Sequence, residues 1–277
     1  MPELPEVESI ASRLREGTPG QAALVGAKIL SAHVFWQRTL VTPSPDRFGE
    51  TLAGQTIQAI GRRGKFLKID LTDHTLLIHL RMSGDLWVEA VDQPLAQHTR
   101  LIINFVDQRR LTFHDPRKFG RVWLLTDPQT VLGVLGPEPF DANLNAQVFY
   151  QRLRGIRRQL KPLLLDQRFL AGLGNIYADE ALHCARLHPL HLSNQVTFAQ
   201  ANHLLECIRA VLSEGIRRHG ASIDWVYRGG NFQNYFRVYR RSGLPCPTCG
   251  APIQKIIVGQ RGTHFCPQCQ PLRREDG

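Results

Sequence analysis

The chain carries two cysteine pairs near its carboxyl end, Cys246-Pro247-Thr248-Cys249 and Cys266-Pro267-Gln268-Cys269, with sixteen residues between them. A gap of two residues lets a tight turn direct both thiolates of a pair at one ion, and this spacing is typical of zinc ribbons. Four thiolates form the closed tetrahedral site of a structural zinc. We therefore predict a zinc-finger β-hairpin over residues 242–277 that depends on one Zn²⁺ to fold. Arg261 lies at or near its tip.

Upstream of this hairpin, the sequence divides into a strand-rich part and a helix-rich part. Residues 5–16 have one apolar face and predict a leading helix. Residues 24–130 contain many short β-rich runs that are separated by turn residues, with no intervening helices, which is typical of a β-sandwich or barrel. The clearest runs are 57–60, 66–69, 75–80, 101–105 and 111–113.

The helix-rich part follows a stiff, proline-containing linker at residues 135–139. Its clearest helix is predicted from about residue 198 to residue 219, with Thr197 as N-cap and Gly220 as the stop. Two cysteines, Cys184 and Cys207, lie in helical patterns and are interpreted as small buried apolar residues. The whole pattern predicts an α+β chain of several domains.

Composition restricts the class of function. The net charge of +10 and the pI of about 9.7 indicate a polyanionic partner. No apolar run reaches the roughly eighteen residues of a membrane span, and the acidic amino terminus lacks the core of a signal peptide. We therefore expect a cytoplasmic protein without a membrane partner. No oligomer interface is evident, so a monomer is the default expectation.

The first residues, Met1-Pro2-Glu3-Leu4-Pro5-Glu6, indicate a chemical activity. If Met1 is removed, Pro2 becomes a free secondary amine, and an α-amino group titrates near pH 8, well below a lysine side chain. A neutral amine can attack a carbonyl-like carbon and form a covalent imine, while Glu3 and Glu6 could move protons. The alternative is that the prolines begin a helix and that Glu6 complements its dipole.

Several further motifs combine with this beginning. In chain order, they are Pro2-Glu3-Leu4-Pro5-Glu6-Val7-Glu8, Arg63-Gly64-Lys65-Phe66-Leu67, His79-Leu80-Arg81-Met82-Ser83-Gly84, Asp115-Pro116-Arg117-Lys118-Phe119-Gly120, Lys161-Pro162-Leu163-Leu164-Leu165-Asp166-Gln167 and Gly172-Leu173-Gly174-Asn175-Ile176-Tyr177. Six such segments, followed by a zinc ribbon, resemble the formamidopyrimidine-DNA glycosylase family over nearly the whole chain. That family removes oxidised purines from DNA and then cuts the strand.

The resemblance implies a fold of four parts. These are a catalytic β-sandwich with a leading helix at 1–135, a helix–two-turn–helix domain at 140–222, a lesion-capping loop and connector at 223–241, and the zinc hairpin at 242–277. It also implies that damaged double-stranded DNA binds in a cleft between two lobes, in a bacterial cytosol or nucleoid.

The resemblance also assigns catalytic roles. The Pro2 nitrogen would attack C1′ of an everted nucleotide, and Glu3 would protonate the opened sugar to give a Schiff base. Lys65 resembles the proton donor of the first strand-cleaving elimination and Arg261 that of the second. Because an arginine has a pKa above 12, we expect Arg261 to clamp the departing phosphate. Glu6 would orient the terminus.

The remaining predicted residues would contact DNA. Met82, Arg117 and Phe119 resemble a set that fills the void left by the everted base; the alternative for Met82 and Phe119 is ordinary strand packing. Lys161 and Asn175 resemble ligands of backbone phosphates. The weaker candidates are His98, Arg157 and Arg158, and a solvated basic face is the alternative for the two arginines.

One segment departs from the family pattern, and two alternative functions remain open. The stretch 222–234, which would cap the lesion, is shorter than expected. This length bears on the preference for 8-oxoguanine and ring-opened purines rather than on the chemistry. The first rival is a related endonuclease VIII-like enzyme for oxidised pyrimidines. The second is a non-catalytic zinc-ribbon DNA-binding protein.

Overall fold

Helix α1 (Leu4–Glu16) forms where the sequence predicts a helix. Glu3 and Glu6 make a capping box at its start, and a proline occupies the first turn, where no amide donor is needed. The helix ends at Gly17, whose φ of 80° favours glycine. Its apolar face, including Val7, Ile10 and Leu14, is buried in the core of the first unit.

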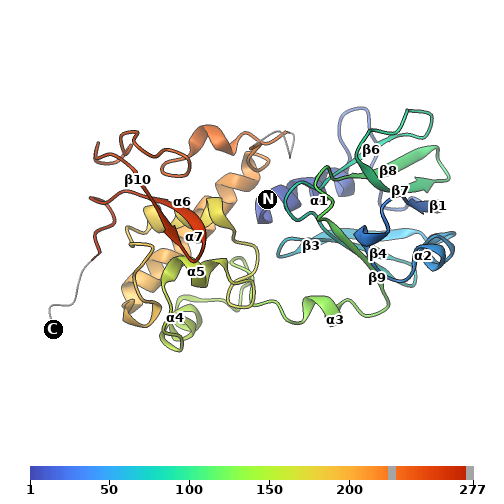
Figure 1. The fold of residues 1–277 in the computed structure, drawn as a ribbon. Coiled ribbons are helices and arrows are strands. Elements are labelled where there is room, and N and C mark those ends of the chain that lie inside the picture. Colours follow the sequence, from blue (N-terminus) through green and yellow to red (C-terminus); the bar gives the residue numbers. More distant parts are fainter. Residues whose placement is uncertain (224–228, 273–277) are drawn as a thin grey trace. The chain divides into compact units, whose positions relative to one another are not determined.

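The computed structural model describes residues 1–223 and 229–272. The chain forms two units, and the second interrupts the first (Figure 1). The first contains residues 1–134 and 219–230, and the second contains residues 135–218 and 231–277. The chain therefore returns briefly to the first unit after the long helix of the second.

Two sheets form the body of the first unit, as the β-sandwich prediction requires. One has the strand order β1-β7-β8-β6 and the other has the order β2-β9-β5-β4-β3. The first sheet contains β1 (Ile29–Val34), β6 (Asp85–Ala90), β7 (Thr99–Phe105) and β8 (Arg109–His114). The second contains β2 (Leu40–Thr42), β3 (Ile57–Arg63), β4 (Phe66–Leu71), β5 (Thr75–His79) and β9 (Arg121–Leu125).

A single apolar core joins these sheets. Side chains of both sheets and of α1 contribute to it, among them Leu67, Ile78, Ile103 and Phe113. Strand β5, in the middle of its sheet, is buried along its whole length. A central strand such as this loses water from both faces, which explains why its three middle residues, Leu76, Leu77 and Ile78, are apolar.

The expectation that no helix interrupts the strands is wrong. Helix α2 (Pro45–Leu52) lies between β2 and β3 and buries Phe48 and Leu52, and the short helix η1 (Gln37–Thr39) precedes β2. Ser44 and Pro45 are a helix-start signal, and Phe48 and Leu52 are four residues apart on one face. The signal was present but short.

The second unit consists of helices and a terminal hairpin. The short helix α3 (Gln129–Leu132) still belongs to the first unit. The α-helices described in the second unit are α4 (Ala146–Arg154), α5 (Leu160–Leu165), α6 (Asn175–Cys184) and α7 (Phe198–Arg217). Two short 3₁₀ helices, η2 (Ser193–Gln195) and η3 (Phe232–Tyr235), accompany them. Helix α7 packs on α4 and α6. Thr197 caps it, because its hydroxyl accepts the Gln200 amide at 3.2 Å. The helix ends two residues before the predicted position.

Cys184 and Cys207 differ from the interpretation of two separate buried apolar residues. They form a disulfide between α6 and α7, with their Cα atoms 5.7 Å apart, and Cys184 is exposed. The pairing depends on how the two helices pack, which their separate helical patterns do not reveal.

Strands β10 (Gln254–Val258) and β11 (Arg261–Phe265) form the terminal hairpin. Gly259 and Gln260 connect them with φ values of 54° and 62°, the conformation of a two-residue type I′ turn. Arg261 therefore stands directly after the tip. The predicted capping segment 223–241 includes residues 224–228, which lie outside the described residues. In the described parts of the chain, no helix is long and apolar enough to cross a membrane.

Candidate active site and nucleic-acid interface

The residues around Pro2 form a buried cluster at the start of α1. Pro2 is buried, and Glu3 and Glu6 are each 2% exposed. One Glu6 oxygen accepts the Glu3 amide at 2.7 Å, and the other accepts the Ala221 amide at 2.7 Å. The Glu6 carboxylate thus links the amino terminus to the segment that returns from the second unit.

Glycine is required beside this carboxylate. Gly220 has a φ of 79°, and a Cβ atom there would lie 2.7 Å from Cγ of Glu6. The close approach fixes the first turn of α1 from the outside. Met1 is exposed and precedes Pro2, so its removal would convert the Pro2 nitrogen from an amide into a secondary amine in this cluster.

Lys65 lies in the two-residue turn between β3 and β4 and is only 5% exposed. Its charge acts on His79. Burial is the main reason that the pKa of His79 falls to about 3, and the positive charges of Arg81 and Lys65 lower it further. The Arg81 amide donates to Nδ1 of His79 at 3.0 Å, and Phe66 packs edge-on against its ring. His79 is therefore neutral at physiological pH.

Three predicted void-filling side chains stand on two exposed loops of the first unit. Met82 and Phe119 are 38% and 45% exposed, which excludes the alternative of ordinary strand packing for both. Arg117 is also exposed, and its guanidinium lies 5.1 Å from the centre of the Phe119 ring. His98 is half-buried beside His114 and contributes its carbonyl to the amide of Asp115.

In the second unit, the structure brings Lys161, Asn175 and Arg261 into one neighbourhood. The Lys161 ammonium donates to the Asn175 carbonyl at 2.9 Å, and the Asn175 side-chain amide donates to the Gly262 carbonyl at 2.9 Å. The hairpin tip packs on the same helix, because a Cβ on Gly259 would lie 3.1 Å from Pro162.

Lys161 is fully buried, which its sequence context did not indicate. Its ammonium pairs with Asp179 at 2.5 Å, and neither side chain is exposed. In this conformation the lysine supports the Asn175 segment from beneath. Arg157 and Arg158 are exposed, and Arg158 pairs with Asp166 at 2.8 Å.

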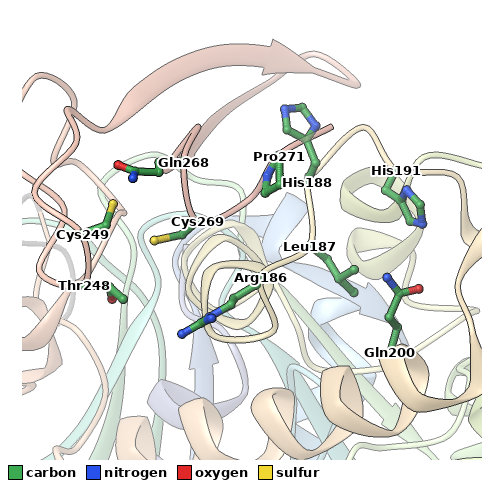
Figure 2. A pocket seen from close by; sticks show the side chains of 10 residues that line it. All are labelled: Arg186, Leu187, His188, His191, Gln200, Thr248, Cys249, Gln268, Cys269 and Pro271. Carbon is green, nitrogen blue, oxygen red and sulfur yellow. The ribbon is translucent and has the colours of Figure 1, made fainter. Parts of the chain in front are cut away.

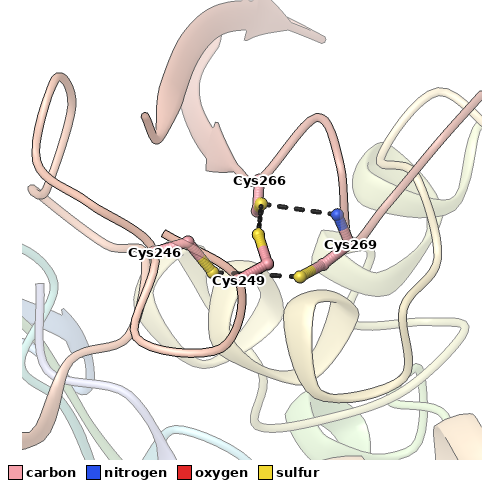
Figure 3. A group of neighbouring side chains, drawn as sticks. All are labelled: Cys246, Cys249, Cys266 and Cys269. Atoms are coloured by element: carbon pink, nitrogen blue, oxygen red, sulfur yellow. Dashed lines mark hydrogen bonds between the residues drawn. The ribbon is translucent and has the colours of Figure 1, made fainter. Parts of the chain in front are cut away.

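The four cysteines of the ribbon form a cluster that fits zinc. Their sulfur atoms all lie within 4.8 Å of one another (Figure 3). The Cys246–Cys269 and Cys249–Cys266 sulfur pairs are 3.9 and 3.4 Å apart, close to the edge of a tetrahedron with about 2.3 Å Zn–S bonds. These cysteines would hold one structural Zn²⁺.

Surrounding groups favour the thiolate form at Cys246, whereas burial and the neighbouring thiols raise the pKa of Cys266 and Cys269. Burial opposes ionisation of Cys246, but the Thr248 amide and His183 hydrogen-bond its sulfur and lower the pKa of the thiol to about 5. Among the described residues, the small core beneath buries Val238 and Ile253 with the ligands Cys246 and Cys266, and Ala251 and Cys269 pack against it partly buried. So little apolar burial explains why the hairpin depends on the metal.

A cavity of about 540 Å³ borders the cysteine cluster (Figure 2). Arg186, His188 and His191 line it together with Cys249 and Cys269. The residues that line it include none of the predicted catalytic or DNA-binding residues.

Sequence reasoning missed several residues that hold the site in place. Asp115 and Ser83 are buried beneath the two exposed loops, and Asp179 and His183 project from α6 toward the hairpin. The sequence feature that could have identified these residues is a polar side chain within an otherwise apolar or turn-forming motif. Their partners are distant in sequence and only the fold identifies them.

Comparison with known proteins gives matches over nearly the whole chain. The formamidopyrimidine-DNA glycosylase N-terminal domain matches residues 1–122, the formamidopyrimidine-DNA glycosylase H2TH domain matches residues 135–226, and the zinc finger found in FPG and IleRS matches residues 243–272. The predicted fold class, a β-sandwich with a leading helix, a helix–two-turn–helix domain and a zinc-finger hairpin, is therefore confirmed.

Individual relatives agree. The formamidopyrimidine-DNA glycosylase of Chloroflexus aurantiacus is 45% identical, over 98% of each chain. The one from Protochlamydia amoebophila is 41% identical, over 98% of this chain and 99% of its own. The Lactococcus lactis FPG (MutM), solved with FAPY-dG containing DNA, superposes with a TM-score of 0.89 at 37% identity, over 98% of this chain and 100% of its own. Because three family domains match most of the chain and these relatives are 41–45% identical over 98% of it, this chain belongs to the formamidopyrimidine-DNA glycosylase family.

Proposed function

We propose that this protein is a base-excision repair enzyme that removes oxidised purines from duplex DNA and then cuts the abasic strand. The observation that carries the proposal is the cluster of Pro2, Glu3 and Glu6 at the start of α1 in a chain of this family. Relatives from Lactococcus lactis were solved with FAPY-dG containing DNA and with DNA that contains an abasic site. These are a substrate and an intermediate of such a reaction.

The Pro2 nitrogen starts the chemistry once Met1 has been removed. Its lone pair attacks C1′, and the bond from C1′ to the damaged base breaks, so that the base leaves with the bonding electrons. The departing base takes up a proton as the Pro2 nitrogen loses its own. Glu3 donates a proton to the ring oxygen as the sugar opens, which leaves a cationic iminium (a Schiff base) between Pro2 and C1′. Glu6 holds the first turn of α1 in place through its bonds to the Glu3 and Ala221 amides.

Strand cleavage follows from the imine. Loss of a proton from C2′ expels the 3′ phosphate, and a second elimination expels the 5′ phosphate. Lys65, buried near His79 in the same unit as Pro2, is suited to proton transfer in the first elimination. Arg261, exposed after the hairpin tip, is suited to holding the phosphate that leaves.

The DNA contacts are proposed on the same basis. Met82, Arg117 and Phe119 fill the space of the everted base, while Asn175, supported by Lys161, binds a backbone phosphate. His98, Arg157 and Arg158 add contacts along the strand. The basic charge of the chain supports a duplex partner. We propose a monomer that acts in the cytoplasm, with the four parts bounded at 1–135, 140–222, 223–241 and 242–277.

Borohydride trapping tests the proposal directly. Reduction of the imine should give a stable adduct between the protein and DNA that carries an abasic site, and Pro2→Gly should abolish the adduct. Absence of an adduct from protein that lacks Met1 would leave only the non-catalytic binder. Excision of 8-oxoguanine compared with thymine glycol separates the purine enzyme from the endonuclease VIII-like alternative.

A further inference from the structure

Two loops that carry the proposed void-filling side chains converge in the first unit. The loop 80–84 follows β5 and presents Met82, and the loop 115–120 joins β8 to β9 and presents Arg117 and Phe119. The two loops are about thirty residues apart in sequence. Side chains that wedge into a base stack must resist the stack's tendency to close, so the two loops need a common support.

Asp115 is the residue at which the loops meet. It is fully buried, with 0% exposure. Its carboxylate accepts the Gly120 amide at 2.7 Å, which closes the loop 115–120 on itself, and it also accepts the hydroxyl of Ser83 from the other loop. Its backbone carbonyl accepts Nε of Arg100 at 2.8 Å, which ties this point to strand β7.

Ser83 completes the connection. Its side chain is buried, its hydroxyl donates to Asp115, and its oxygen accepts the Arg117 amide at 3.2 Å. One hydroxyl thus bonds to the buried carboxylate and to the backbone that carries an exposed arginine. Because Ser83 directly follows Met82, the bond also fixes where Met82 stands relative to Arg117.

Packing leaves little room for the loops to shift. A Cβ on Gly84 would lie 2.8 Å from the Phe113 ring and 2.6 Å from the Leu80 carbonyl, and a Cβ on Gly120 would overlap the same ring. On the outer side, the Lys118 ammonium lies 4.2 Å from the centre of the Trp36 ring. The loops are therefore held from inside and from outside.

We propose that Asp115 is a positioning residue that, through the Ser83 hydroxyl, joins the Met82 loop and the Arg117–Phe119 loop into one rigid wedge for opening duplex DNA. The inference rests on the proposed function. Asp115 touches neither the reacting sugar nor the base in this scheme. Its contribution is therefore specific to substrates whose base must be everted from a stack.

The test compares duplex DNA with single-stranded DNA. Ser83→Ala and Asp115→Asn are measured by single-turnover excision of 8-oxoguanine from a duplex and by the fluorescence of 2-aminopurine placed beside the lesion. In each variant, the rate of excision from the duplex and the rate of base eversion reported by 2-aminopurine should both fall by about tenfold or more. This is the factor expected for one lost charge-assisted hydrogen bond. Borohydride trapping on single-stranded abasic DNA, which has no stack to open, should stay within about twofold of wild type.

Two further variants control for folding. Ser83→Thr retains the hydroxyl and should recover most of the duplex rate. Asp70→Asn removes a different carboxylate that accepts a hydroxyl, that of Thr75 at 2.9 Å, and should leave both rates unchanged. Ser83→Ala is the milder change, so it decides the question if Asp115→Asn does not fold.

The outcomes separate the two proposals. Duplex rates equal to wild type in Ser83→Ala, or equal losses on duplex and single-stranded DNA, would overturn the wedge inference alone. A wild-type protein without Met1 that forms no adduct on abasic DNA would overturn the proposed function, and the wedge inference with it. Selective loss on duplex DNA that Ser83→Thr restores is the supporting result.

Discussion

His79 makes the stability of the first unit depend on pH. Burial is the main reason that its pKa falls from 6.5 to about 3, and the charges of Arg81 and Lys65 add to the shift. Protonation would also place a proton on Nδ1, which accepts the Arg81 amide at 3.0 Å. Acid must therefore weaken the fold, since the unfolded chain takes up this proton more readily than the folded one.

The magnitude follows from the two pKa values. Between the folded pKa of about 3 and the unfolded value of 6.5, the unfolded state binds more protons, so stability rises with pH across this window. His79 contributes no penalty well above pH 6.5, and the penalty grows as the pH falls. Between pH 7 and pH 5 it amounts to about 2 kcal/mol of unfolding free energy.

The assay compares the wild-type protein with His79→Asn, which keeps an acceptor near the position of Nδ1. Urea unfolding is followed by tryptophan fluorescence, because Trp36, Trp87 and Trp123 all lie in the first unit. The wild type should lose about 2 kcal/mol more than the variant between pH 7 and pH 5. Exposed His33, changed to Asn, is the matched control. Equal pH dependence in wild type and His79→Asn would refute the reasoning.

Two other perturbations test the second unit. Removal of zinc by a chelator should release one ion per chain and unfold the hairpin over residues 243–272, while the tryptophan signal of the first unit stays unchanged; retained amide protection in the zinc-free hairpin would contradict this. Lys161→Met should leave the buried Asp179 carboxylate without its cation and lower the unfolding free energy by about 3–5 kcal/mol. Calorimetry measures the loss, and the double change Lys161→Met with Asp179→Asn should recover part of it.

Local chemistry explains which features the sequence could predict. The start of α1 depends on Pro5 and on the Glu3–Glu6 capping box, and the start of α7 on Thr197; each signal lies within four residues. The zinc site could be predicted because the two-residue spacing within each cysteine pair fixes the geometry of the site. Helix α2 was missed because eight residues give little periodicity beside the strong β pattern around it.

Features that depend on pairing across the chain could not be predicted. The Cys184–Cys207 disulfide requires that α6 and α7 pack in one particular register. The bond between Ser83 and Asp115 requires two loops to meet over one phenylalanine ring. Burial of Lys161 was equally hidden, because lysine is almost always exposed unless a partner is buried with it, and Asp179 is eighteen residues away.

Helix α6 shows how such hidden pairs can be anticipated. Its sequence is largely apolar and buried, yet it contains Asp179, Glu180 and His183. A buried charge must find partners, and these find theirs in the following segment: Asp179 accepts the His264 amide, Glu180 accepts three successive amides at 237–239, and His183 contacts the Cys246 sulfur.

The arrangement has a consequence for the hairpin. Desolvation raises the pKa of Glu180, and hydrogen bonds from the three amides at 237–239 oppose that rise. The ionised carboxylate is therefore stabilised by the connector at 237–239, and the same bonds hold this connector on α6. Hydrogen bonds from Asp179, Glu180 and His183 therefore connect the helix that carries Asn175 to the zinc hairpin and its connector. Polar residues on the inner face of an apolar helix indicate a segment that must dock there, and in this chain that segment is the one that presents Arg261.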